Sequence, residues 1–130
     1  MLRRTAALKA IHAEKVFLMV GINDLGLDEN VDAVAAKYRE ILATLTAPGT
    51  EIYAQSVLYI TERSILNERI KLLNARLKSF CERGECIFID LNTSMAPDGF
   101  LPNNVSADGL HLNARGYQLW RDLIAKFVAK

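Results

Sequence analysis

The sequence of 130 residues predicts an α/β fold with a parallel sheet, and three observations support this prediction. Apolar segments of strand length occur at 15–20, 51–59 and 86–90. Helical patterns over 31–46 and 65–83 separate them, so strands and helices alternate along the chain. The first strand segment is apolar without alternation, which is typical of a strand buried on both faces. This order favours parallel strands joined by right-handed helical crossovers.

The two helices between the strands are predicted from apolar residues that recur every three or four positions. Asn30 is the expected N-cap of the helix at 31–46, since its side chain can accept from a free amide of the first turn. Ser64 could do the same for the helix at 65–83, and Gly84 is placed to end that helix. Both helices should therefore have well-defined boundaries.

Two further helices, over 2–12 and 114–128, complete the predicted layers. We expect them to cover the face of the sheet opposite to the helices at 31–46 and 65–83. The stretch 92–109 is rich in proline, glycine and asparagine and is expected to be irregular. We expect residues 1–130 to form one domain.

The overall composition excludes several classes of function. The formal net charge is +1, which predicts binding neither to nucleic acid nor to an anionic membrane surface. No apolar segment reaches the roughly 18–20 residues of a membrane span. Residues 1–4 are not followed by the long apolar segment of a signal peptide, so none is predicted, and the location of the protein stays open.

The two cysteines, Cys81 and Cys86, have no metal-binding spacing. We expect two free thiols near a helix end and a strand start. A disulfide closing this short loop is the alternative in an oxidising compartment.

Polar groups suited to catalysis follow the first strand and precede the last helix. In a parallel sheet, ligands bind beyond the carboxyl ends of the strands, where both of these segments should lie. Asp108 is three residues before His111, so a turn at Gly109 would let the carboxylate reach one imidazole nitrogen and leave the other as a general base. The side-chain amide of Asn23 could donate to an oxyanion.

These two segments resemble motifs of the SGNH hydrolases, also called GDSL-type serine esterases. Residues 15–25, a strand followed by Gly-Ile-Asn-Asp, resemble the third sequence block of that family. Residues 106–117, with Asp-Gly-Leu-His and then Asn and Gly-Tyr, resemble the fifth block. The strand segments at 52–56 and 87–91 and the helix that carries Asn67 and Asn74 are similar to the family's intervening elements.

The resemblance implies a three-layer, flavodoxin-like fold and hydrolysis of carboxylic esters, such as acetyl or short acyl esters. It implies that His111 is the base, Asp108 its orienting acid and Asn23 an oxyanion donor, with Gly21 and Asp24 shaping the loop. It implies no metal and no organic cofactor, because acyl transfer of this kind needs neither.

The sequence departs from the family pattern at its N-terminal blocks. It contains neither the Gly-Asp-Ser segment that carries the nucleophile nor the second block, whose glycine completes the oxyanion hole. We therefore expect the 130 residues alone to be inactive. The competing hypothesis is a non-catalytic α/β module that binds an acylated ligand or a protein partner.

The missing blocks also have a structural consequence. In the family's strand order, the first strand lies beside the strand at 15–20. Without it that strand has an exposed edge, which favours pairing with another copy of the chain or with the rest of a longer protein.

Overall fold

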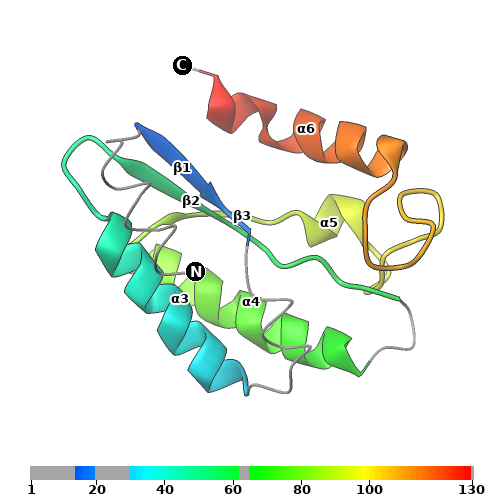
Figure 1. Ribbon diagram of the computed structural model, residues 1–130, viewed down its shortest axis with the longest axis horizontal. Helices are drawn as coiled ribbons and strands as arrows, with labels where there is room; N and C mark the ends of the chain where they lie inside the picture. Colours follow the sequence, from blue (N-terminus) through cyan, green and yellow to red (C-terminus); the bar gives the residue numbers. More distant parts are fainter. Residues whose placement is uncertain (1–13, 20–29, 62–64, 130) are drawn as a thin grey trace.

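A parallel three-stranded sheet lies between helices in the computed structural model, which describes residues 14–19, 30–61 and 65–129 (Figure 1). In chain order the elements are β1 (Lys15–Leu18), α3 (Val31–Leu45), β2 (Glu51–Gln55), α4 (Leu66–Glu82), β3 (Ile87–Ile89), α5 (Asn92–Met95) and α6 (Ala114–Val128). The predicted helix at 2–12, the predicted cap Ser64 and the loop residues Gly21, Asn23 and Asp24 lie outside the described residues.

The strands are arranged in the order β1-β2-β3, and both pairs are parallel. Val16 is in register with Ile52, and Ala54 is in register with Phe88. Sequential strands therefore lie side by side, each joined to the next by a helical crossover. The predicted parallel α/β fold is confirmed.

Each face of the sheet is covered by a different set of helices. Figure 1 shows α3 and α4 together on one side and α6 on the other. The larger core lies under α3 and α4 and contains Tyr38, Leu42 and Leu73, which are at most 2% exposed. The smaller core lies under α6 and is centred on Tyr53 and Ile124. The predicted placement of these three helices is therefore correct.

The start of α3 and the end of α4 follow local signals in the sequence. Asn30 Oδ1 accepts from the amide of Ala33 at 2.7 Å and so caps α3. At the end of α4, Gly84 has a φ of 88°, its amide donates to Cys81 O at 2.9 Å and the amide of Glu85 donates to Phe80 O at 3.2 Å. This pair of bonds with a left-handed glycine is a Schellman motif, which satisfies the last carbonyls of the helix.

The second strand, Glu51–Gln55, is shorter than the predicted 51–59. From Val57 onward, asparagine side chains take the place of β3 as hydrogen-bond partners of the backbone. The amide of Val57 donates to Asn74 Oδ1 at 2.7 Å, and Asn74 Nδ2 donates back to Val57 O at 2.9 Å. Asn92 accepts from Tyr59 N at 3.0 Å, and Asn67 accepts from Ile60 N at 2.8 Å. Ser56 N still donates to Ile89 O of β3 at 2.9 Å. Residues 57–61 are tied by these asparagines to helices α4 and α5 instead.

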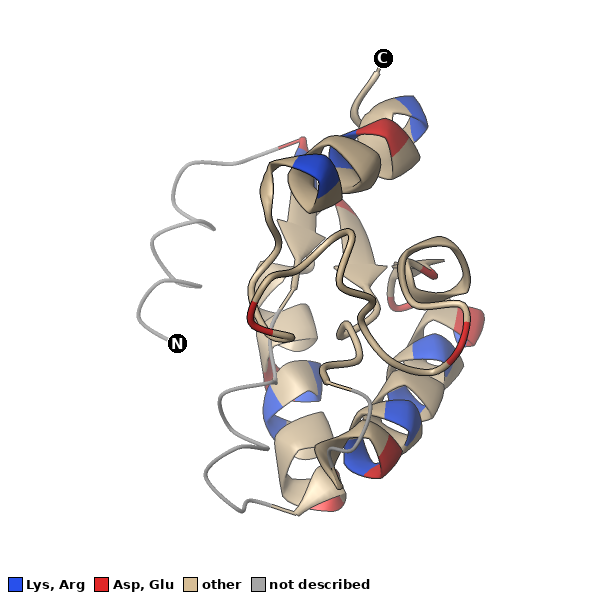
Figure 2. Cartoon of the chain, turned by 90° about the vertical axis from the view of Figure 1, so that its right-hand side faces the viewer, with Lys and Arg blue, Asp and Glu red and all other residues tan. Residues whose placement is uncertain are grey.

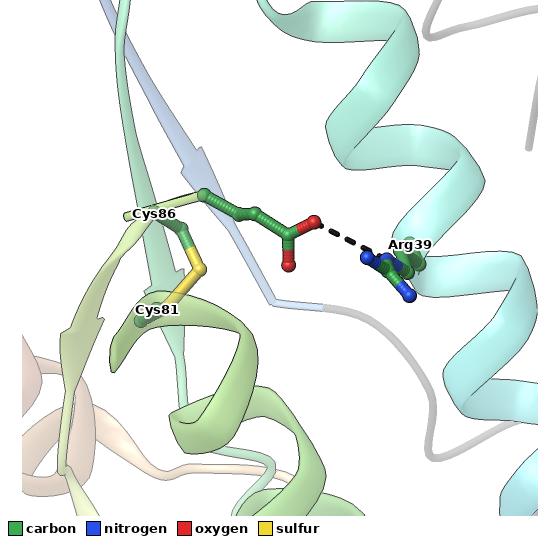
Figure 3. The surroundings of a disulfide bond; sticks show 4 residues. Arg39, Cys81 and Cys86 are labelled. Atoms are coloured by element: carbon green, nitrogen blue, oxygen red, sulfur yellow. Dashed lines mark hydrogen bonds and ion pairs between the residues drawn. A yellow bond between two sulfur atoms is a disulfide. The ribbon is translucent and has the colours of Figure 1, made fainter. Parts of the chain in front are cut away.

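Two further predictions are corrected. The stretch 92–109 is not wholly irregular, because it begins with the short helix α5. Cys81 and Cys86 are not free thiols: they form a disulfide that joins the end of α4 to the segment before β3 (Figure 3). Beside this disulfide, Arg39 on α3 pairs with Glu85 at 3.2 Å.

Basic and acidic residues are intermixed along the helices, as Figure 2 shows. Within residues 14–19, 30–61 and 65–129, no helix has the length and apolar character needed to cross a membrane.

Candidate functional site

The candidate site is the turn formed by residues 106–111, which joins the region after α5 to α6. On its N-terminal side, the amides of Val105 and Ser106 both donate to Pro102 O at 3.2 Å. On its C-terminal side, Asn113 donates its amide to Val105 O at 2.8 Å and caps α6 by accepting from Gly116 N at 2.8 Å. The turn is therefore held at both ends by backbone hydrogen bonds.

Asp108 and His111 are in direct contact within this turn. The distance from His111 Nδ1 to Asp108 Oδ2 is 2.8 Å. The other carboxylate oxygen, Oδ1, accepts from the amides of Leu110 at 2.8 Å and His111 at 2.7 Å. The carboxylate thus fixes both the backbone and the ring of His111, which is the contact that the Asp-x-x-His spacing predicts.

The environment of Asp108 strongly favours its ionised form. The side-chain hydrogen bond from His111 lowers the pKa of this carboxyl well below its usual value, and the amide bonds from His111 and Leu110 lower it further. Asp108 therefore stays negatively charged at neutral pH. A charged carboxylate on Nδ1 favours the tautomer that carries its proton there and leaves Nε2 as an acceptor.

Both side chains of this pair are accessible to solvent. The side chain of His111 is 75% exposed and that of Asp108 is 56% exposed. The ring of His111 can therefore be contacted by a molecule or a side chain from outside this turn. The predicted roles of Asp108 as orienting acid and His111 as base stay predictions.

A fully buried residue, Ser106, lies beneath the exposed pair. Its hydroxyl accepts from the amide of Gly109 at 2.9 Å and is 2.6 Å from His111 O and 3.2 Å from Asp108 Oδ1. The sequence predicted no role for this residue and did not predict these contacts. The signal available in the sequence was its position two residues before Asp108, where short polar side chains often bond to a following turn.

The turn packs closely against the segment that follows β2. Gly109 has a φ of 77°, and a Cβ atom placed on it would lie 2.9 Å from Cβ of Thr61. The carbonyl of Thr61 accepts from Asn67 Nδ2 at 2.9 Å, so α4 fixes the surface against which the turn rests. A cavity of about 440 Å³ adjoins this contact. Its lining includes Thr61, Phe100, Pro102, Asp108 and Gly109.

The nucleophile and the oxyanion donor are not placed by the described residues. Asn23, Gly21 and Asp24 lie outside them, so the convergence of Asn23 with His111 stays a prediction. Ser56, the serine nearest a strand end, is 1% exposed and accepts from the amide of Leu91 at 2.9 Å. This burial favours a structural rather than a nucleophilic role.

The chain is similar to several known proteins over most of its length. N-acylneuraminate cytidylyltransferase from Streptococcus agalactiae is 24% identical over 115 residues, which is 88% of this chain and 28% of that protein. A solved structure from Streptococcus pneumonia, provisionally assigned as a platelet activating factor, is 26% identical with a TM-score of 0.80. The match covers 88% of this chain and 59% of that one.

A second solved structure is that of a carbohydrate esterase. Carbohydrate esterase family 3 from Talaromyces cellulolyticus is 19% identical with a TM-score of 0.78, and the match covers 95% of this chain and 61% of that one. The chain thus spans less than two thirds of each of these relatives. Its fold is the flavodoxin-like, three-layer α/β fold of the SGNH hydrolases.

The sequence model of the GDSL-like lipase/acylhydrolase family matches residues 1–119, which include the first strand, the Asp108–His111 turn and the start of α6. The match therefore covers both of the segments from which the resemblance was inferred. The chain belongs to the GDSL-like lipase/acylhydrolase family.

Proposed function

We propose that this chain carries the acid–base part of a serine ester hydrolase that acts on acetyl or short acyl esters. His111 is the general base, Asp108 orients it and Asn23 donates a hydrogen bond to the oxyanion. The observation that carries the proposal is the 2.8 Å contact between Asp108 Oδ2 and His111 Nδ1. Membership of the GDSL-like lipase/acylhydrolase family supports the reaction class.

In the proposed reaction, Nε2 of His111 takes the proton of a serine hydroxyl as that oxygen attacks the ester carbonyl. The imidazolium that forms is stabilised by the adjacent Asp108 carboxylate. His111 then returns the proton to the leaving alcohol, and water hydrolyses the acyl-enzyme by the same route. The attacking serine is supplied from outside the 130 residues, which contain no Gly-Asp-Ser segment.

The test is an esterase assay with p-nitrophenyl acetate on the product of the longest reading frame that contains these 130 residues. We expect His111→Ala to lower kcat by roughly 10²–10⁴-fold, the usual contribution of a general base. Asn23→Ala should lower it by roughly 10²–10³-fold. The isolated 130 residues should hydrolyse the ester no faster than free imidazole at the same concentration.

The matched control is His12→Ala, because His12 is the other of the two histidines in the chain. It should keep the parent activity. Turnover that survives His111→Ala, or a loss of equal size in His12→Ala, would show that the proposed base is wrong.

A further inference from the structure

The exposed pair of the turn at 106–111 follows a hydrogen-bonded segment, named the platform, that ends in two buried residues. The platform is residues 102–106, in which Val105 and Ser106 both donate to Pro102 O and Val105 O accepts from Asn113 N. Val105 and Ser106 are 3% and 0% exposed. The side chains of the pair, Asp108 and His111, are largely exposed and are therefore not held in place by burial in the core. A contact between the platform and the turn is therefore needed to hold the pair in a fixed position.

The hydroxyl of Ser106 makes this connection at two points. It accepts the amide proton of Gly109, which fixes the turn directly after Asp108. It has a single proton to donate, and the carbonyl of His111 at 2.6 Å is a much closer acceptor than Asp108 Oδ1 at 3.2 Å. The hydroxyl therefore holds the backbone on both sides of Leu110.

We propose that Ser106 is a positioning residue of the esterase site, whose buried hydroxyl keeps the Asp108 carboxylate aligned with Nδ1 of His111. The inference rests on the proposed function for its catalytic meaning. Without the hydroxyl, the carbonyl of His111 and the amide of Gly109 lose their partner inside the turn. The carboxylate–imidazole contact then depends only on the exposed hydrogen bonds of Asp108.

The test of this proposal measures the tautomer of His111. The contact with the Asp108 carboxylate determines it, because the carboxylate favours a proton on Nδ1. Nitrogen-15 NMR of the imidazole distinguishes Nδ1–H from Nε2–H at a pH where the ring is neutral. The chain has only two histidines, so a His12→Gln background leaves one imidazole in the spectrum. The parent chain should show His111 mainly as the Nδ1–H tautomer.

Three variants separate positioning from general stability. Ser106→Ala should shift His111 toward the tautomer mixture of a short unstructured peptide, and Ser106→Thr, which keeps the hydroxyl, should restore the parent spectrum. Ser56→Ala is the matched control, because Ser56 is equally buried and its hydroxyl accepts one backbone amide, that of Leu91. It should lower the melting temperature without changing the tautomer.

The inference is overturned if folded Ser106→Ala keeps the parent tautomer, or if Ser56→Ala shifts it by as much. Should Ser106→Ala fail to fold, Ser106→Cys is measured instead, since its weakly donating thiol should give an intermediate mixture. In the full reading-frame product, Ser106→Ala should lower kcat by roughly 10- to 100-fold with little change in KM. A tautomer shift with no effect of His111→Ala on turnover would reject the proposed function and leave the positioning role intact.

Discussion

At the scale of single residues, the charge of Asp108 depends on donors that lie within three positions of it. Those donors lower the pKa of Asp108 in the folded chain below its usual value of 3.8. Ionised Asp108 therefore stabilises the folded state at pH values above 3.8. This contribution is present at neutral pH and is lost as the pH falls through the lower pKa of the folded state. The acid–base contact should therefore persist in weakly acidic solution.

A carbon-13 NMR titration of the Asp108 carboxyl measures this directly. We expect its midpoint to lie below 3.8, and the midpoint should return toward that value in His111→Ala, since the largest cause of the shift is the imidazole. A midpoint at or above the usual value in the parent chain would mean that the contact does not form in solution.

Gly109 is the second residue whose chemistry the turn requires. Its left-handed backbone costs a residue with a Cβ about 1–2 kcal/mol, and here the new atom would also press against Thr61. Gly109→Ala should therefore lower the free energy of unfolding by more than Gly99→Ala. Gly99 has a similar φ of 88° with no atom within 4 Å of the added Cβ, so it isolates the backbone cost. Urea unfolding of both variants gives the difference, and equal losses would show that Thr61 moves aside freely.

At the scale of elements, asparagine side chains of α4 and α5 form the hydrogen bonds that a neighbouring strand would otherwise form with the segment after β2. Val57 is 3% exposed, and Asn74 satisfies both its amide and its carbonyl. Asn74→Ala should lower the free energy of unfolding by about 1–3 kcal/mol, because it leaves a buried backbone amide without its partner. Asn103→Ala, at an exposed position, should change it by less than about 0.5 kcal/mol. Chemical denaturation that gives equal values for the two would contradict this role.

The sequence was sufficient to predict helices and strands because periodicity and caps are local. Asn30 and Gly84 mark helix ends through contacts made within a few residues. The end of β2 was missed, since the β-type residues after Gln55 continue without a break and only the folded chain brings Asn74 and Asn92 beside them. The contacts of Ser106 were missed although they are local, because the sequence does not show which nearby backbone groups its hydroxyl bonds to.

At the scale of the whole molecule, the disulfide fixes the junction between α4 and β3 on one side of the sheet. It closes a loop across a sequence separation of 5, for which a chain-entropy estimate gives a stabilisation of about 2 kcal/mol. Around it, the guanidinium of Arg39 pairs with Glu85 and lies 5.7 Å from the ring centre of Phe80, so α3 is held to the same junction. The spacing of the two cysteines carried no decisive signal, which is why free thiols were expected.

Reduction by a dithiol should therefore lower the melting temperature of the parent chain. The double variant Cys81→Ser/Cys86→Ser should melt at the temperature of the reduced parent and should not respond to the reductant. Thermal unfolding followed by circular dichroism makes the comparison. A parent chain that melts identically with and without the reductant would show that the bond adds no stability.

The outer edge of the sheet leads to a prediction about assembly. Among the described strands, β1 pairs with β2 alone. We propose that its other edge pairs with a strand from another copy or from the rest of a longer protein. Light scattering of the isolated 130 residues should then show self-association that increases with concentration. A monomer mass at every concentration would contradict pairing between copies.

The contact between Asp108 and His111 is formed within one short peptide. The hydrogen bonds that hold the two side chains join residues between 106 and 111. Bending or twisting of the sheet would carry acid and base together as a unit. Such motions would change how the imidazole approaches a serine held elsewhere, while the distance between the two partners stayed the same. A segment of this kind could be grafted between the same flanking elements of a related scaffold with its proton-transfer geometry preserved.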